Sequence, residues 1–160
     1  MTKDMISLME QQINKELYSA YLYYDIAEYY RSKGLDGLHA HFEAQAREEI
    51  EHAEKFSEYL HDMEVSFKLL PIEAPNNNFK DLREPLALQL EHEKYVTSLI
   101  LKIVDQADKD GDRRTANFAD WFVTEQLEEE KHSKEMLGKY DLYAKDGGLG
   151  LFQYDKQYLK

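Results

Sequence analysis

The sequence predicts an all-α protein, a four-helix bundle with one long crossover loop and a short fifth helix at the C-terminus. Three observations lead to this fold class. Only 7 glycines and 3 prolines occur among 160 residues, a composition typical of helix-rich proteins. Four long segments repeat apolar residues at helical spacing. Two of the connections between them are short and one is long, and residues 1–160 are expected to form one domain.

The first two helices are expected at about 4–33 and about 36–64. Gly34 is expected to end the first helix, and Asp36 is a plausible N-cap for the second. Each helix has one apolar stripe. The stripe residues are Ile6, Met9, Ile13, Ala20, Tyr23 and Ala27 in the first helix, and Leu38, Phe42, Phe56 and Leu60 in the second.

The third helix is expected at about 82–108, after a crossover loop at about 65–80 that has no helical periodicity. The loop contains two prolines and three consecutive asparagines, at 76–78. Asp81 and Glu84 have the spacing of a capping pair at the helix start. The apolar stripe is Leu82, Leu86, Leu90, Val96, Ile100 and Val104.

The fourth helix is expected at about 113–144, and a glycine pair at 147–148 separates it from a short helix at about 149–158. The connection lengths predict the topology. The short joints make the first–second and third–fourth pairs antiparallel. The crossover of about 16 residues can span roughly 50 Å, more than the roughly 42 Å length of a 28-residue helix. The third helix can therefore run parallel to the second.

Charge and cysteine content exclude several classes of function. The chain has 20 basic and 32 acidic residues, a net charge of −12, which disfavours nucleic acid and favours cations as partners. The absence of cysteine excludes disulfides, thiolate catalysis and iron–sulfur clusters. No apolar signal region and no stretch of about 18 apolar residues is present, so a soluble cytoplasmic protein without membrane contact is expected.

A duplicated spacing of polar residues predicts a two-metal site. In each half of the chain a glutamate is followed 33 residues later (49 − 16 and 126 − 93) by a polar pair three residues apart. Residues three apart share one helix face. Carboxylates with imidazole suit iron, manganese or zinc rather than calcium. The two sets are Glu16, Glu49 and His52, and Glu93, Gln126 and Glu129.

The acids of these sets lie on the apolar stripes of their helices. Glu93, for example, is three residues from both Leu90 and Val96. A buried carboxylate is costly, so four converging ones require cations to neutralise them. The alternative, a solvated acidic face, suits other acids of the chain such as Glu28 and Glu58 better.

The role expected for each histidine depends on whether another potential metal ligand lies near it in the sequence. A lone histidine on an apolar stripe is usually a core residue, but the position of His52 three residues after Glu49 favours a ligand. Glu129-x-x-His132 is a rival pair that we reject because it would change the spacing from 33 to 36 residues. Surface or packing roles are expected for His39, His41, His61 and His92.

Three segments resemble those of bacterial non-haem ferritins: 14–19 (NKELYS), 48–53 (EEIEHA) and 121–130 (WFVTEQLEEE). The similarity extends to Gly150-Leu151-Phe152, and Glu-x-x-His in a crossover bundle is the known arrangement of ferritin-like di-iron proteins. The resemblance implies an iron-storage ferroxidase that oxidises Fe(II) with dioxygen or peroxide at a di-iron centre. It also implies that ferric oxyhydroxide is stored in a hollow homo-oligomeric cage of 24 subunits.

The resemblance also implies a role for each site residue. The first iron would be held by Glu16, Glu49 and His52, and the second by Glu49, Glu93 and Glu129. Gln126 would lie beside the second iron, with Tyr23 near the centre. A third iron site on the inner side would use Glu48, Glu125, Glu128 and Glu129. Glu51 and Glu54 match acids that face the mineral cavity in some ferritins.

Two differences distinguish this chain from other ferritin subfamilies. Bacterioferritins have Glu-x-x-His in the fourth helix and a methionine haem ligand where this chain has Ile50, so no haem is expected. Animal ferritins have acids in their threefold pores, at positions where this chain has Ala116 and Ala119, with Asp120 adjacent. Iron could enter through a local pore beside the centre or past Asp120, and both routes stay open.

Three other functions are alternatives to a storage ferroxidase. A rubrerythrin-like peroxide-detoxifying protein is disfavoured by the absence of cysteine for a rubredoxin-type electron donor. Starved-cell mini-ferritins share ligands between subunits, whereas both ligand sets lie within this one chain. A helical scaffold that only binds cations on its surface is the non-enzymatic alternative. The sequence does not decide the preferred oxidant or the reductant for iron release.

Overall fold

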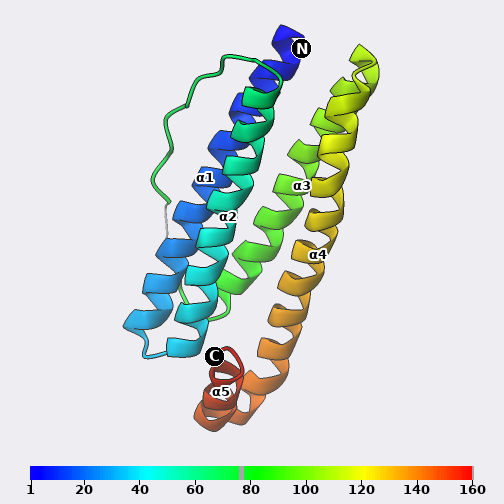
Figure 1. Cartoon of the computed structure of the whole chain (residues 1–160). Coiled ribbons are helices and arrows are strands. Elements are labelled where there is room, and N and C mark those ends of the chain that lie inside the picture. Colours follow the sequence, from blue (N-terminus) through cyan, green and yellow to red (C-terminus); the bar gives the residue numbers. More distant parts are fainter. Residues whose placement is uncertain (76–77, 160) are drawn as a thin grey trace.

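The computed structural model describes residues 1–75 and 78–159 and contains four long helices and a short C-terminal one (Figure 1). The predicted all-α bundle is confirmed. The elements are α1 (Lys3–Ser32), α2 (Asp36–Asp62), α3 (Glu84–Asp110), α4 (Arg113–Tyr143), a 3-10 turn η1 (Ala144–Asp146) and α5 (Gly147–Lys156). None of the helices in the described residues is long and apolar enough to cross a membrane.

The chain follows the predicted crossover topology. Helices α1 and α2 form one antiparallel pair, α3 and α4 form the other, and the connection from α2 runs along the outside of the first pair (Figure 1). Helix α3 therefore runs parallel to α2. The loop is fastened to α1 by the Asn14 side-chain amide, which donates to the carbonyls of Leu70 and Pro71. Residues 76 and 77 of the predicted loop lie outside the described residues.

Helix α3 starts two residues later than expected. The Asp81 carboxylate accepts hydrogen bonds from the backbone N–H groups of Arg83 and Glu84, both at 2.9 Å. It therefore caps this end of the helix as the sequence suggests, but the capping turn itself is not helical. Pro85 occupies the first turn, where a missing N–H is tolerated.

The prediction that Asp36 is the N-cap of α2 is wrong. Asp36 is the first helical residue, and Leu35 stands at the N-cap without a side-chain hydrogen bond. The carboxylate of Asp155, from α5, accepts instead from the backbone N–H groups of Gly37 and Leu38 at 3.2 and 2.8 Å. A Cβ at position 37 would lie 1.9 Å from the Asp155 carbonyl oxygen, so glycine is needed there. This contact fixes α5 across the end of the bundle.

The C-terminal helix begins earlier than expected, at Gly147 rather than 149. The turn η1 follows α4 directly, and Gly147 adopts a positive φ of 65°, which lets the chain change direction. The Tyr154 hydroxyl then donates to the carbonyl of Met136 in α4, at 2.9 Å.

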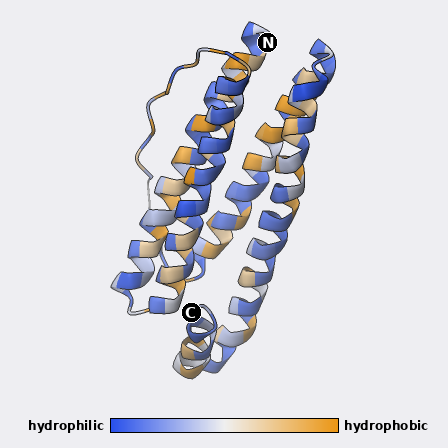
Figure 2. Ribbon diagram, viewed as in Figure 1, coloured by the Kyte–Doolittle hydropathy of each residue, from blue (hydrophilic) through white to orange (hydrophobic). Residues whose placement is uncertain are grey.

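The core consists of two hydrophobic clusters with a polar layer between them. One cluster includes Ile13, Phe56, Ile100 and Phe122, and the other is centred on residues such as Phe42. On every long helix, the predicted metal ligands fall between the segments that supply the two clusters, whereas Tyr23 belongs to the second cluster. Figure 2 shows orange and blue bands alternating along the helices, as expected when each has one apolar face. The polar layer comprises Glu16, Glu49, His52, Glu93, Gln126 and Glu129, all buried.

Candidate metal centre

The first predicted ligand set converges inside the bundle. Glu16 of α1 and Glu49 and His52 of α2 are at most 4% exposed, and one ligand atom of each lies within 4.8 Å of the others. His52 Nδ1 is 3.2 Å from Glu49 Oε2 and 4.0 Å from Glu16 Oε2. Two carboxylates and an imidazole at this spacing can hold a metal ion.

A glutamine that the sequence analysis did not single out positions Glu16. Gln12, also buried, donates from Nε2 to Glu16 Oε1 at 2.7 Å. Glu16 Oε2 has no hydrogen-bond partner among the described residues. One oxygen is thus held by the protein while the other faces the set. Gln12 stands one turn before Glu16 on the same stripe, and that spacing was the signal by which it could have been found.

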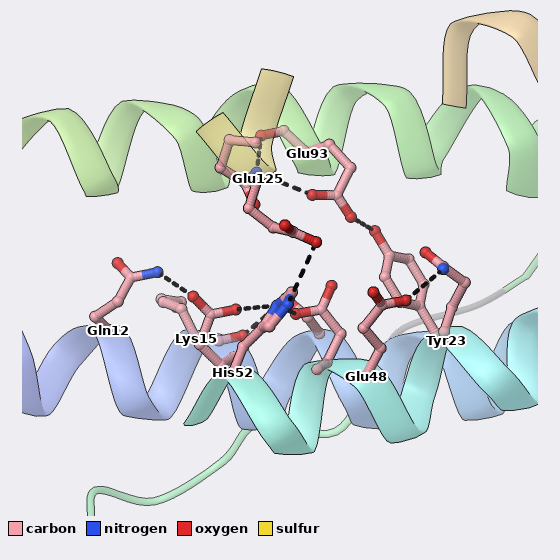
Figure 3. Close-up of polar contacts among 12 residues, drawn as sticks. Gln12, Lys15, Tyr23, Glu48, His52, Glu93 and Glu125 are labelled. Carbon is pink, nitrogen blue, oxygen red and sulfur yellow. Dashed lines mark hydrogen bonds and ion pairs between the residues drawn. The ribbon is translucent and has the colours of Figure 1, made fainter. Parts of the chain in front are cut away.

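The second ligand set is arranged differently. The Glu93 carboxylate accepts a hydrogen bond from the Tyr23 hydroxyl and another from Gln126 Nε2 at 3.0 Å, and Gln126 also donates to the Glu93 carbonyl. Figure 3 shows the Tyr23 ring directed at this carboxylate. Glu129 is 7% exposed, and its Oε2 has no hydrogen-bond partner among the described residues. The structure therefore brings the six predicted residues and Tyr23 into one layer.

The carboxyl groups of this layer resist ionisation. Burial raises the pKa of both Glu16 and Glu49 well above the ordinary value. The negative charge of Glu49 raises the pKa of Glu16 further, and the negative charge of Glu93 raises that of Glu49 further. Burial, followed by the charge of Glu93, raises the pKa of Glu129 to about 9. Cations in the layer would supply the charge that allows these acids to ionise together.

Tyr23 is a hydrogen-bond donor in this layer. Burial and the nearby Glu93 raise the pKa of its phenol well above the ordinary value, so it keeps its proton near neutral pH. Burial also raises the pKa of Glu93, while the Tyr23 and Gln126 hydrogen bonds lower it in part. These two hydrogen bonds therefore offset only part of the effect of burial, and the pKa of Glu93 stays raised overall.

His52 also faces a second group of acids. Its Nε2 is 3.9 Å from Glu125 Oε1, and ligand atoms of Glu48, His52 and Glu125 lie within 4.8 Å of one another. Figure 3 shows Glu125 approaching His52 from the side of α3 and α4. The two nitrogens of one imidazole therefore face two different carboxylate groups. All four acids of the predicted third site line a cavity of about 670 Å³ beside this group, namely Glu48, Glu125, Glu128 and Glu129.

Two further hydrogen-bonded pairs flank the layer without having been predicted. Thr97 Oγ1 donates to Glu130 Oε1 at 2.7 Å, one turn along α3 from Glu93. His92, expected to pack, is buried and shares a 2.7 Å hydrogen bond with Ser19. Burial lowers the pKa of His92 to about 4, so it is neutral near pH 7.

The other residues of sequence interest lie elsewhere. Ala116 and Ala119 are buried in the first hydrophobic cluster, while Asp120 is exposed beside them. Glu51 and Glu54 are exposed on α2, as acids facing solvent should be. The rival ligand His132 lies against His41.

Comparisons with known proteins place this chain and its fold in one family. Residues 6–143 match the ferritin-like domain. The chain is 35% identical over 160 residues to a bacterial non-heme ferritin of Campylobacter jejuni, covering 100% of this chain and 95% of the relative. It is 33% identical to a probable bacterial non-heme ferritin-like protein of Haemophilus influenzae, with 98% and 94% covered. An open-pore ferritin of Archaeoglobus fulgidus superimposes with a TM-score of 0.95 at 32% identity, over 99% of this chain and 97% of that one. The chain belongs to the ferritin family.

Proposed function

We propose that this protein is an iron-storage ferroxidase that oxidises Fe(II) to Fe(III) and stores the product as ferric oxyhydroxide. Membership of the ferritin family supports iron storage. The observation that carries ferroxidase activity is the buried set of Glu16, Glu49 and His52, facing Glu93 and Glu129 across the bundle. The relatives reported above are all named as ferritins, and none of these names favours a rubrerythrin-like peroxide-detoxifying role.

In this proposal two Fe(II) ions occupy the polar layer as substrate. Glu16, Glu49 and His52 hold the first, Glu49, Glu93 and Glu129 hold the second, and Gln126 and Tyr23 keep Glu93 in place. Hard carboxylate oxygens stabilise Fe(III) relative to Fe(II), which favours oxidation. Each iron gives up one electron, so a pair supplies the two electrons that convert dioxygen and two protons into hydrogen peroxide. Peroxide as oxidant would take the same two electrons and two protons to give water.

The product iron needs a way out and a place to accumulate. We propose a third iron site at Glu48, Glu125, Glu128 and Glu129, which line the cavity next to His52. We also propose that the chain works in the cytoplasm as a hollow homo-oligomer of 24 subunits, as family resemblance implies. Sedimentation of the purified protein tests the assembly, because a monomer without iron would contradict it.

Iron loading tests the ferroxidase proposal. The metal-free protein is loaded anaerobically with two Fe(II) per chain and exposed to air, and the ferric absorbance is followed. Glu49→Ala and His52→Ala should each slow the first turnover by about 100-fold or more, since even a lost supporting contact around a metal costs about 10- to 100-fold. Dioxygen and peroxide are compared as oxidants in parallel.

Matched controls come from the same helix. Glu58→Ala and His61→Ala remove an exposed glutamate and an exposed histidine of α2 and should leave the rate unchanged. If Glu49→Ala and His52→Ala oxidise iron as fast as the parent, the assignment of this centre is wrong.

A further inference from the structure

A pair of histidines lines the cavity that contains the proposed third site. His41 of α2 and His132 of α4 have ring centres 5.3 Å apart with planes 26° from parallel. Both line the same cavity as Glu48 and Glu128. His132 is exposed and His41 half-buried, so the pair is accessible to ions from solvent. Neither residue belongs to the ligand sets of the proposed ferroxidase centre.

The pair continues two stripes of potential ligands. On α4, Glu128 lies one turn before His132, and residues four apart share a helix face. On α2, Glu48 lies seven residues after His41, on the same face. His41 is 11 residues from His52 (52 − 41), and His132 is 7 from Glu125 (132 − 125). These separations correspond to about 16 and about 10 Å along the helices. His132 is nevertheless only three residues from Glu129 (132 − 129), so on α4 the pair adjoins the buried layer.

The spacing of the two rings suits a shared metal ion. An imidazole nitrogen lies about 1.1 Å from its ring centre and a Zn–N bond is about 2.1 Å long, so two imidazoles sharing a tetrahedral zinc have ring centres about 5 Å apart. The observed 5.3 Å is close to this value. Among the described residues, the ligand atoms of His41, His132 and Glu128 do not all lie within 4.8 Å of one another. Metal binding therefore requires the two rings to rotate about their Cβ–Cγ bonds, which can turn a nitrogen of each toward a common point.

We propose that His41 and His132 form a divalent-metal site in this cavity, together with the carboxylate of Glu128, which the proposed third site also uses. Imidazole nitrogen suits borderline divalent ions such as Fe(II), Zn(II) and Co(II), whereas Fe(III) prefers the oxygen-rich centre. The site holds Fe(II) outside the buried centre, in a cavity that Glu125 beside His52 also lines. This use for Fe(II) rests on the proposed function, but the existence of the site does not.

Zn(II) titration tests the site without any iron oxidation. The experiment uses the full-length protein with Glu49→Ala and His52→Ala, which disable the buried centre and leave the outer pair intact. Calorimetry should show a Zn(II) binding event that His41→Ala and His132→Ala together weaken by at least about 10-fold, as expected when two ligands are lost. His61→Ala, the matched control, should change nothing. Circular dichroism confirms that each variant is folded.

Unchanged Zn(II) affinity in the variant without His41 and His132 would overturn the site. A crystal soaked in Zn(II) gives a second readout: anomalous density between the two rings supports the site, and density confined to carboxylates contradicts it.

Iron uptake by the otherwise unaltered protein tests the role of the site in supplying Fe(II). Losing both histidines should slow repeated turnovers at limiting Fe(II) by at least threefold, roughly 0.6 kcal/mol, while the first turnover of preloaded protein is unchanged. If repeated turnover is unchanged in the variant without both histidines, the site does not supply Fe(II), although it can still exist. If the parent protein shows no first turnover, the proposed ferroxidase function is contradicted instead.

Discussion

The two halves of the polar layer hold their carboxylates by different means. In the α1–α2 half, Glu16 Oε2 and a Glu49 oxygen face His52 Nδ1, and Glu16 Oε2 has no hydrogen-bond donor among the described residues. In the α3–α4 half, both the Tyr23 hydroxyl and the Gln126 amide donate to Glu93. The first half leaves one Glu16 oxygen without a protein donor, whereas in the second half both oxygens of the Glu93 carboxylate accept from side chains.

This difference predicts an order of metal binding. In the first half Gln12 donates to Glu16 Oε1 and His52 shares a hydrogen bond with Glu49, but Glu16 Oε2 accepts none from the described residues. A cation can therefore bind this oxygen without displacing a protein donor. A cation that binds Glu93 must share or replace the hydrogen bonds that this carboxylate already accepts. Each such bond contributes about 0.5–1.5 kcal/mol to stability, and more when one of its groups is ionised. The first half should therefore fill first and bind more tightly.

The largest expected effect is a fall in the stability of the metal-free protein as pH rises. The folded protein keeps protons on its buried acids that the unfolded chain releases above its ordinary glutamate pKa. For Glu129 the relevant pH range runs from about 4.5, the ordinary glutamate pKa, to about 9, its pKa in the folded protein. The protonated side chain contributes its full stability below this range, and the contribution is lost as pH rises through it. We expect a loss of about 2 kcal/mol or more between pH 5 and pH 8, measured by urea unfolding.

Two variants and added Zn(II) show whether the buried acids cause this dependence of stability on pH. Glu129→Gln should flatten the pH dependence, while Glu128→Gln, an exposed neighbour, should not. With Zn(II) bound, the acids are ionised in the folded state, so stability should rise with pH over the same window. A metal-free protein whose stability is constant from pH 5 to pH 8 would show that the buried acids are not held protonated.

The next effect concerns the filling order itself. In a His41→Ala, His132→Ala background, Glu16→Ala should weaken the tightest Co(II) site by at least about 10-fold, because it removes a ligand of the half that fills first. Glu129→Ala should leave that site nearly unchanged and weaken only a second, looser one. Absorption titration with Co(II) distinguishes the two. The opposite ranking of the two variants would reverse the comparison between the halves.

The sequence predicted the residues of this layer because they lie on long, regular helices. A helix fixes the faces of residues three, four and seven apart, so the apolar neighbours of Glu93 were enough to place it in the core. Gln12 follows the same rule and could have been included. The crossover was predictable from loop length alone.

Contacts between distant segments could not be predicted in this way. The Asp155 carboxylate caps α2 from more than 100 residues away (155 − 37) and displaces the local candidate Asp36. The meeting of His41 with His132 depends on the register between α2 and α4, which side-chain packing sets. Sequence spacing gave His41 no partner for this reason.

The smallest expected effect comes from the hydrogen bond that most clearly separates the halves. Tyr23→Phe removes the hydroxyl that donates to Glu93 and leaves the ring packed on Phe42. The metal-free protein should lose about 1–2 kcal/mol in urea unfolding at pH 8, because a larger share of Glu93 is ionised there and a carboxylate accepts a stronger hydrogen bond. At pH 5 a smaller share of Glu93 is ionised, so the loss should be smaller. Co(II) affinity of the second site should rise slightly, because the metal no longer competes with the phenol. Equal losses at both pH values, together with unchanged second-site affinity, would mean that Tyr23 only packs, and Glu93 would then be as free to bind a cation as Glu16.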